Sequence, residues 1–269
     1  NPLDFLNKQF DASLIKDVQT KWIPYDFKNQ NIDDFLENLD IDKTVEISSI
    51  QGGYSNAIKQ LNKFIEVGYQ DYAKYRSDPS KEASSQLSPY FHSGQISTHE
   101  VFDKISELES WSPESINPKM VGRREGWWGS TENFESFMDE LITWRELGYH
   151  TCVRRANYNQ YSSLPEWAIK TLHEHSSDER EHIYSLDELT YSQTHDEIWN
   201  AAQNQLRTQG VIQNYLRMLW GKKILEWTPN PQIALSYMIT LNDRYSLDGR
   251  DPNSYSGVFW ILGRYDRAW

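Results

Sequence analysis

The sequence contains one cysteine and no long apolar run, and each absence excludes a class of protein. Cys152 alone among 269 residues cannot build an intrachain disulfide framework or a multi-cysteine zinc or iron–sulfur site. No apolar run approaches the roughly 18 residues that a membrane-spanning helix requires, so we expect no membrane partner. The first ten residues lack the basic and apolar regions of a secretory signal, which leads us to expect an intracellular, cytoplasmic protein.

Several familiar functional motifs are missing as well. The sequence has no G-x-G-x-x-G, no G-x-x-x-x-G-K-[ST] and no G-x-S-x-G, which disfavours a Rossmann dehydrogenase, a P-loop NTPase and an α/β-hydrolase. Four histidines gather between residues 171 and 200, but no H-E-x-x-H occurs among them (His173, His175, His182, His195). We therefore expect a solvated acidic surface there and no metal site.

Basic residues are fewer than acidic ones, 27 against 39, so the net charge is −12. The excess of acidic residues is unevenly distributed along the chain. Residues 171–200 hold eight acidic residues and one basic residue, Arg180, so this window alone carries −7 of the total. The remainder of the chain is close to balanced, so the overall charge does not exclude a face that meets a polyanion.

Aromatic residues are abundant, with 11 Trp, 16 Tyr and 10 Phe, which excludes a disordered acidic chain. Apolar residues recur at three- and four-residue steps, and no alternating run indicates a strand. The pattern predicts an all-α fold, with helices from Tyr54 onward and over 133–154, 197–209 and 210–227. We expect residues 1–54 to be a leader with short helices and residues 55–269 to form one helical domain.

The segment from Gln213 to the C-terminus carries the most specific signal. QNYLRMLWGKKILEWTPNP resembles the flavin-contacting helix of the cryptochrome/photolyase family, and LNDRYSLDGRDPNSYSGVFW resembles its Asp-Gly loop in the class II form. Three further blocks agree in order: YAKYRSDP…SSQLSPYFHSGQIS, DELITWREL and HDEIWNAAQ. The resemblance implies the family's helical FAD-binding domain, without its N-terminal α/β antenna domain and without its C-terminal tail.

The resemblance also implies a set of residues that hold FAD. Arg217 and Asp248 match an ion pair beside the isoalloxazine ring, where the guanidinium would stabilise negative charge on reduced flavin. An asparagine is expected near flavin N5, and Asn242 and Asn253 are both candidates. The other matching cofactor positions are the serine-rich segment Ser84, Ser85, Leu87 and Ser88, together with Tyr72 and Arg145. Without the resemblance, an N-cap and surface ion pairs would explain these residues equally well.

Two more groups of residues match the family's substrate pocket and electron-transfer chain. Glu140 matches a carboxylate that bonds a pyrimidine dimer flipped out of DNA, and Trp144 matches the ring that stacks on it. Asn214, Met218 and Trp260 match other positions of that pocket. Trp220, Trp227 and Trp199 match redox-active tryptophans, although each alone is equally explained as a core residue.

The function that the resemblance implies is light-driven DNA repair, in which reduced FAD splits cyclobutane pyrimidine dimers by electron transfer. The expected partner is dimer-containing DNA, in the nucleoid when bound, and we expect the protein to act as a monomer. A cryptochrome-like blue-light photoreceptor, or a flavin redox module without repair activity, would use the same domain. A preference for dimer-containing over intact DNA separates repair from signalling.

Overall fold

The computed structural model describes residues 31–123 and 125–267. Contacts within the chain divide it into two compact units, Asn1–Thr44 and Val45–Trp269. The described part of the first unit contains one short helix, α3 (Ile32–Glu37). Most of the expected leader, residues 1–30, lies outside the described residues, and the larger unit begins earlier than the expected boundary at residue 55.

Helices are the only regular elements in the described ranges, so the predicted all-α class is confirmed. Those of the larger unit are α4 (Tyr54–Lys63), α5 (Tyr72–Tyr75), α6 (Ser88–His92), α7 (Thr98–Leu108), α8 (Glu132–Met138), α9 (Arg145–Arg154), α10 (Glu166–Glu174), α11 (Leu186–Thr190), α12 (Glu197–Gln209), α13 (Asn214–Glu226), α14 (Pro231–Tyr245) and α15 (Pro252–Ile261).

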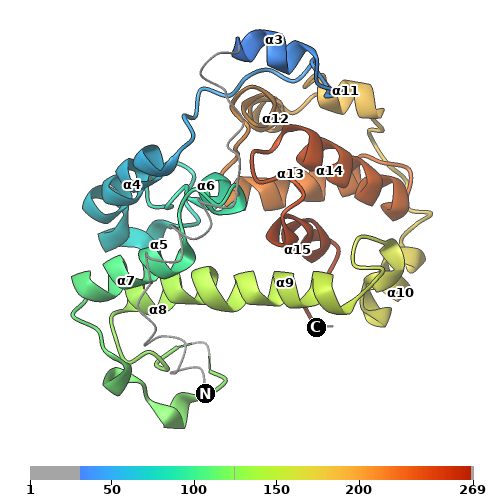
Figure 1. The fold of residues 1–269 in the computed structure, drawn as a ribbon. Coiled ribbons are helices and arrows are strands. Elements are labelled where there is room, and N and C mark those ends of the chain that lie inside the picture. Colours follow the sequence, from blue (N-terminus) through green and yellow to red (C-terminus); the bar gives the residue numbers. More distant parts are fainter. Residues whose placement is uncertain (1–30, 124, 268–269) are drawn as a thin grey trace. The chain divides into compact units, whose positions relative to one another are not determined.

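The two longest predicted helices exist but change their winding midway. The π-helix η1 (Phe64–Gly68) follows α4 directly, and the π-helix η5 (Asp139–Trp144) joins α8 to α9. Figure 1 shows α8 and α9 as one nearly continuous rod. Hydrophobic periodicity cannot separate a π-turn from an α-turn, and such turns are frequent at functional sites. The second of them carries Glu140 and Trp144.

The helix expected from residue 210 to 227 begins later and ends one residue sooner than predicted. Gly210 adopts the left-handed conformation (φ 75°) and closes α12, because glycine alone reaches that region without strain. Gln213 then caps α13 by accepting hydrogen bonds from the backbone N–H groups of Tyr215 and Leu216. Trp227 is consequently the C-cap of α13, where the chain turns toward α14.

The main core lies among α12, α13, α14 and α15 (Figure 1), and α15 also packs on α9. Three tryptophans are buried there: Trp199, Trp220 and Trp227. A second aromatic cluster, between α7 and α8, contains Trp111, Trp127, Trp128, Phe102 and Phe134. Trp22 and Trp269 lie outside the described residues. Much of the tryptophan content therefore serves packing.

One glycine in the core tests how tightly α13 packs against its neighbours. A Cβ on Gly221 would lie 2.1 Å from Ile261 Cδ1 and 3.0 Å from Met238 Sδ, whereas a Cβ on Gly257 would meet nothing within 4 Å. Gly221→Ala should therefore destabilise the protein by about 1–3 kcal/mol in urea unfolding. The matched control Gly257→Ala, inside α15, should stabilise it by about 0.5–1 kcal/mol. Equal effects of the two substitutions would contradict this packing.

Candidate functional site

The expected ion pair forms between α13 and the loop that joins α14 to α15. Arg217 Nη1 and Nη2 each lie 3.4 Å from Asp248 Oδ1, and the two side chains are only 16% and 15% exposed. The hydroxyl of Ser246 donates to the same carboxylate oxygen. Burial raises the pKa of Asp248, but attraction by Arg217 and hydrogen bonds from Ser246 and Ser88 outweigh it, so the pKa lies below its usual value.

Gly249, the second residue of the Asp-Gly loop, lies where the loop backbone passes close to the backbone at the end of α14. A Cβ there would lie 2.9 Å from the carbonyl oxygens of Asn242 and Ser246, at the end of α14. The left-handed residue of the turn is Arg250, with φ 66°. Glycine is therefore needed at position 249 because the loop meets the end of α14 there.

Two buried polar atoms of this region have no hydrogen-bond partner: Asn242 Oδ1 and Arg217 Nε. Asn242 is 1% exposed and donates through Nδ2 to Ser254 Oγ, which leaves its carbonyl oxygen unpaired. Buried polar atoms normally have partners, so an acceptor and a donor in this state suit a polar ligand. Reduced flavin offers an N5–H donor and ring acceptors, and these residues therefore fit the group.

The second candidate asparagine is already bonded within its own turn. Asn253 Nδ2 donates to Asp251 Oδ1 at 3.0 Å, and its backbone N–H donates to the same oxygen at 2.8 Å, by which Asp251 caps α15. The sequence left both asparagines open as the flavin N5 contact. The unpaired carbonyl oxygen of Asn242 makes it the better match for an N–H donor.

The serine-rich segment reaches the same ion pair. Its residues lead into α6, and Leu87 is fully buried. Gln60 on α4 donates to the carbonyl of Ser85 at 2.9 Å, and the Ser88 hydroxyl bonds Asp248. The segment that contains Ser84 is thereby fixed at both sides, and Ser88 joins it to the ion pair.

Arg145 is engaged elsewhere. Its Nη1 donates to Glu146 at 2.9 Å, and its guanidinium lies 4.5 Å from the ring centre of Tyr149 on the same helix. Both contacts lie within α9. Its expected cofactor contact stays a prediction.

Arg76 is a site residue that the sequence reasoning missed. It forms a short ion pair with Glu140 and lies over the buried ring of Tyr72, 5.9 Å from its centre. Its backbone carbonyl accepts from Gln213 Nε2 at 2.8 Å, at the start of α13. The spacing was a usable signal, because Arg76 follows Tyr72 by four residues, one helical turn.

The two tryptophans expected in the substrate pocket lie in contact with each other. The ring centres of Trp144 and Trp260 are 4.5 Å apart at 31°, and Tyr265 lies 6.0 Å and 6.3 Å from them. Trp144 is held by a hydrogen bond from Nε1 to Asp139. The rings form one aromatic surface, so a base can only lie against it and not between them. Met218 is half-buried on α13, and Asn214 is exposed in its first turn.

The three expected redox tryptophans form a continuous row in which Trp199 occupies the middle. Trp220 and Trp199 are parallel within 1° at 6.5 Å between centres, and Trp227 lies 5.6 Å from Trp199. Trp199 Nε1 donates to the carbonyl of Trp220, and Trp220 Nε1 donates to Gln203. Trp220 and Trp227 belong to α13 and its C-cap, and α12 supplies Trp199 between them.

Two histidines of the acidic window, His182 and His195, lie at the Trp227 end of this row. His195 lies 5.2 Å from Trp227 and 3.9 Å from His182, ring centre to ring centre, and its Nδ1 is 2.7 Å from the Tyr184 hydroxyl. Within the described ranges, no three His, Cys, Asp or Glu side chains gather as a metal would require. None of the described helices is long and apolar enough to cross a bilayer.

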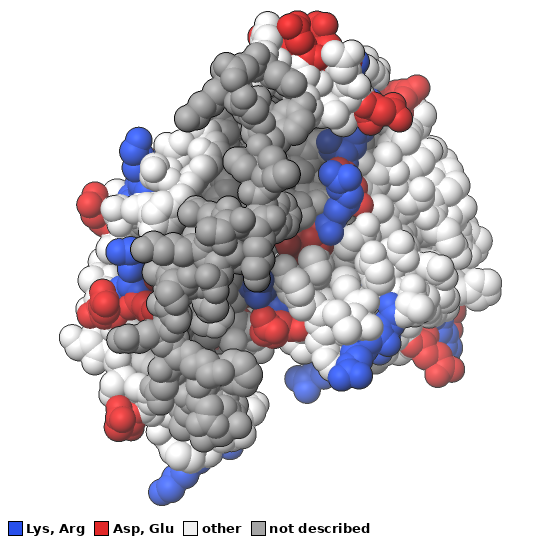
Figure 2. Space-filling model, viewed as in Figure 1, with Lys and Arg blue, Asp and Glu red and all other residues white. Residues whose placement is uncertain are grey.

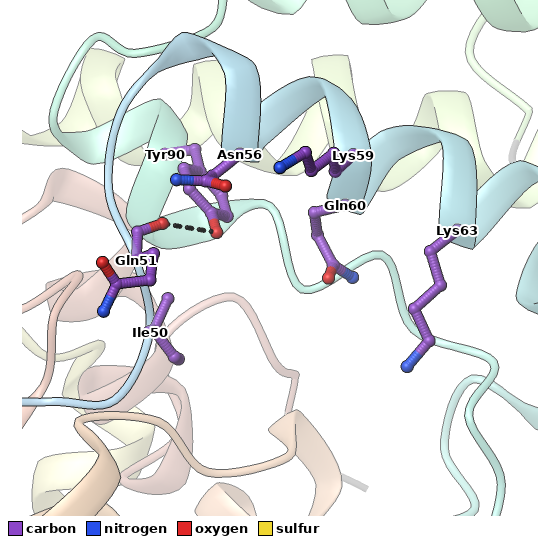
Figure 3. Close-up of a pocket in the computed structure, with 7 residues that line it drawn as sticks. All are labelled: Ile50, Gln51, Asn56, Lys59, Gln60, Lys63 and Tyr90. Carbon is purple, nitrogen blue, oxygen red and sulfur yellow. Dashed lines mark hydrogen bonds between the residues drawn. The ribbon is translucent and has the colours of Figure 1, made fainter.

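A pocket of about 310 Å³ lies apart from these residues, on α4 and the segment before it (Figure 3). Figure 3 shows Lys59 and Lys63 on one helix, with the Tyr90 hydroxyl bonded to the carbonyl of Gln51. None of the predicted site residues lines it, although Gln60 connects its wall to Ser85. The pocket therefore adjoins the serine-rich segment without being lined by it.

The Arg217–Asp248 pair should make stability depend on acid. Because the pKa of Asp248 is lower in the folded state, its contribution is complete above its usual value of 3.8 and disappears as the pH falls through the folded value. Asp248→Asn should lower the melting temperature at neutral pH, and the difference from wild type should shrink below pH 3.8. Glu66→Gln, at an exposed carboxylate, should show neither effect in the same thermal series. A difference for Asp248→Asn that persists unchanged into acid would contradict this reading.

Comparisons with known proteins agree with this geometry. No family model matches the chain. It is 39% identical over 237 residues to a deoxyribodipyrimidine photo-lyase of Methanothermobacter thermautotrophicus, covering 88% of this chain and 48% of that protein. It is 37% identical to the protein of the same name from Potorous tridactylus, covering 86% of this chain and 40% of that protein. The chain thus spans about half the length of such relatives, or less.

Solved structures share the fold at low identity. A class III photolyase from Agrobacterium tumefaciens aligns with TM-score 0.60 and 18% identity, over 90% of this chain and 44% of that one. A Synechocystis sp. PCC6803 cryptochrome aligns with TM-score 0.58 and 14% identity, over 86% of this chain and 43% of that one. A Sulfolobus tokodaii photolyase with two FAD molecules aligns with TM-score 0.56 and 16% identity, over 90% of this chain and 46% of that one.

The fold and the arrangement of residues define an all-helical domain of the type found in photolyases and cryptochromes. The chain belongs to the photolyase/cryptochrome family.

Proposed function

We propose that this chain is the FAD-binding domain of a class II photolyase that repairs cyclobutane pyrimidine dimers in DNA. The observation that carries the proposal is that residues expected on the cofactor and on the substrate adjoin, since Arg76 touches both Tyr72 and Glu140. Relatives at 37–39% identity that bear the photo-lyase name support it. Reduced FAD, when bound and excited by light, supplies the electron that opens the dimer.

The chain's own residues would hold and orient this cofactor. Arg217 would place its guanidinium and unpaired Nε beside the ring, and Asp248 would keep the guanidinium oriented. Asn242 would accept from the flavin N5–H, since its carbonyl oxygen has no other partner. Ser84, Ser85, Leu87 and Ser88 would meet the phosphates beside Tyr72. Arg145 and Asn253 stay candidates for further contacts.

On the substrate side, the aromatic surface of Trp144 and Trp260 would take the place of the base stack that a flipped dimer loses. Glu140 would bond the pyrimidine edge, with Met218 and Asn214 at the side of α13. We further propose that the protein acts inside the cell as a monomer that needs no metal.

The tryptophan row would return the cofactor to its reduced form after oxidation. Trp220 would give up an electron first, and Trp199 and then Trp227 would refill it in turn. Ring centres 5.6–6.5 Å apart support short hops between adjacent indoles. Nearly complete burial of all three keeps their orientation fixed.

A cryptochrome-like photoreceptor is the second candidate, and charge favours it. On the described part of the face in Figure 2, Lys and Arg are interspersed with Asp and Glu and form no continuous basic stripe. A DNA-binding protein usually shows such a stripe. A photoreceptor or redox module would use the same flavin and tryptophans without binding dimers preferentially.

The test is blue-light repair of an oligonucleotide that contains one cyclobutane thymine dimer. Purified, FAD-loaded and chemically reduced protein should restore the dimer to two thymines under light and leave it intact in the dark. It should also bind this strand more tightly than the intact strand. If folded, FAD-loaded protein neither repairs the dimer nor prefers the dimer-containing strand, the repair function is refuted and the photoreceptor remains as the candidate function.

A further inference from the structure

One side chain of α12 holds the indole N–H of Trp220, the residue expected to give up an electron first. Trp220 Nε1 donates to Gln203 Oε1 at 2.8 Å, and the two residues are 1% and 0% exposed. An indole N–H can only donate, so the atom of the amide that faces it is the carbonyl oxygen. Gln203 follows Trp199 by one helical turn, and Trp199 Nε1 donates to the backbone carbonyl of Trp220. α12 therefore holds Trp220 both at its ring and at its backbone.

The nitrogen of the same amide gains nothing from this position. Gln203 Nε2 is buried and has no hydrogen-bond partner in the described ranges, which lowers the stability of the folded state. A glutamate would fill the same space and accept the same hydrogen bond without a spare donor. The amide differs from that carboxylate in being neutral and in taking up no proton.

This difference matters when Trp220 loses an electron, because the N–H of an oxidised indole is strongly acidic. If the proton moved to a base, Trp220 would become a neutral radical, and an electron from Trp199 would then have to form an indole anion. With the proton in place, the same electron restores neutral tryptophan. In the described ranges the one buried Asp, Glu or His is Glu135, which bonds the backbone of Gly129 on the other side of the helix α9.

We propose that Gln203 is a positioning residue of the electron path, whose amide oxygen holds the indole of Trp220 parallel to Trp199 and leaves the Nε1 proton on the ring while the electron passes. The excited flavin gains one electron and Trp220 loses one. Trp199 then returns one electron to Trp220, and no proton moves in either step. The inference rests on the tryptophan row of the proposed function.

The hydrogen bond is tested on cofactor-free, ¹⁵N-labelled protein, in which the indole N–H signal of Trp220 is identified by its loss in Trp220→Phe. Gln203→Met should shift this signal and speed its exchange with solvent, because a thioether is a weak acceptor. The indole signal of Trp199 should change little, since its bond goes to a backbone carbonyl. An unchanged Trp220 signal in folded Gln203→Met would overturn the proposed contact.

Gln203→Glu tests the role of the proton, because it keeps the shape and the acceptor and adds a base. Burial raises the pKa of a carboxyl group at this position, so at low pH the group is neutral and should act as the amide does. As the pH rises and the carboxyl ionises, the rate of light-driven FAD reduction should fall several-fold. Gln209→Glu, exposed at the end of the same helix, is the matched control at each pH. A ratio of the two rates that does not change with pH would contradict the inference.

Transient absorption reports the protonation state of the radical. In a Trp199→Phe background the radical stays on Trp220, and it should be the cation radical when Gln203 is present. Adding Gln203→Glu to that background should give the neutral radical once the carboxyl is ionised. A neutral radical beside the native amide, or a cation radical in the Gln203→Glu protein at every pH, would overturn the proposal.

Gln203→Met decides the matter if Gln203→Glu does not fold or does not bind FAD. A several-fold slower photoreduction at an unchanged melting temperature would support the positioning role, and an undiminished rate would refute it. Failure of the tryptophan row itself is distinguishable from these outcomes. In that case Trp220→Phe would leave the photoreduction of the flavin unchanged.

Discussion

Replacing Trp220 with phenylalanine should abolish the light-driven reduction of FAD bound to this chain. Phenylalanine fills most of the same buried space but is much harder to oxidise, so the row would lose its first electron donor. The rate of flavin bleaching under blue light, with an external thiol as reductant, should fall to that of the dark sample. Trp199→Phe should have the same effect on sustained reduction, because Trp199 separates Trp220 from Trp227.

A matched control comes from the second aromatic cluster. Trp111 packs on Phe134 with ring centres 5.5 Å apart, in the cluster between α7 and α8, whereas the row belongs to α12 and α13. Trp111→Phe should therefore leave photoreduction at the wild-type rate. Unchanged bleaching in Trp220→Phe, with flavin bound and the fold intact, would eliminate the row as the electron path.

Replacing Asn242 with leucine should weaken FAD binding without lowering the stability of the cofactor-free protein. The substitution removes a buried carbonyl oxygen without a partner, which costs the folded state about 1–3 kcal/mol. Ser254 would lose its contact with Asn242, but a helical serine can bond a carbonyl one turn back. The cofactor-free protein should therefore be at least as stable as wild type in urea. Its affinity for FAD should fall about tenfold, the worth of one hydrogen bond from a buried group.

Asn253→Ala provides the comparison for this prediction. Asn253 already bonds Asp251 through its side chain, so its loss should alter FAD affinity less than the loss of Asn242. Both Kd values can be obtained from the quenching of flavin fluorescence. Stronger loss of FAD from Asn253→Ala than from Asn242→Leu would reverse the assignment of the N5 contact.

The helical architecture was predictable because long helices bury an apolar stripe that recurs with the helical period. Residues 197–209 were assigned with the observed bounds of α12. The start of α13 was missed because Gly210 and Gln213 end one helix and cap the next, and such local signals are weak beside a continuing apolar pattern. The π-turn at Asp139–Trp144 leaves no trace in periodicity.

The candidate site was predictable only as a collection of residue types. Resemblance named Tyr72 and Glu140, but the ion pair that connects them through Arg76 depends on packing between α5 and the rod formed by α8 and α9. The place of Trp199 between Trp220 and Trp227 likewise depends on how α12 packs against α13. That Asn242 keeps a buried, unpaired carbonyl oxygen depends on how α14 packs, and no spacing rule contains that information.

The most direct test of this account is the visible absorption spectrum of the purified chain after incubation with FAD and removal of free cofactor, recorded before and after blue light. The account predicts one tightly held flavin per chain, whose absorption band in the blue bleaches under light when a reductant is present. A folded protein that retains no flavin, or whose flavin does not bleach, would contradict it.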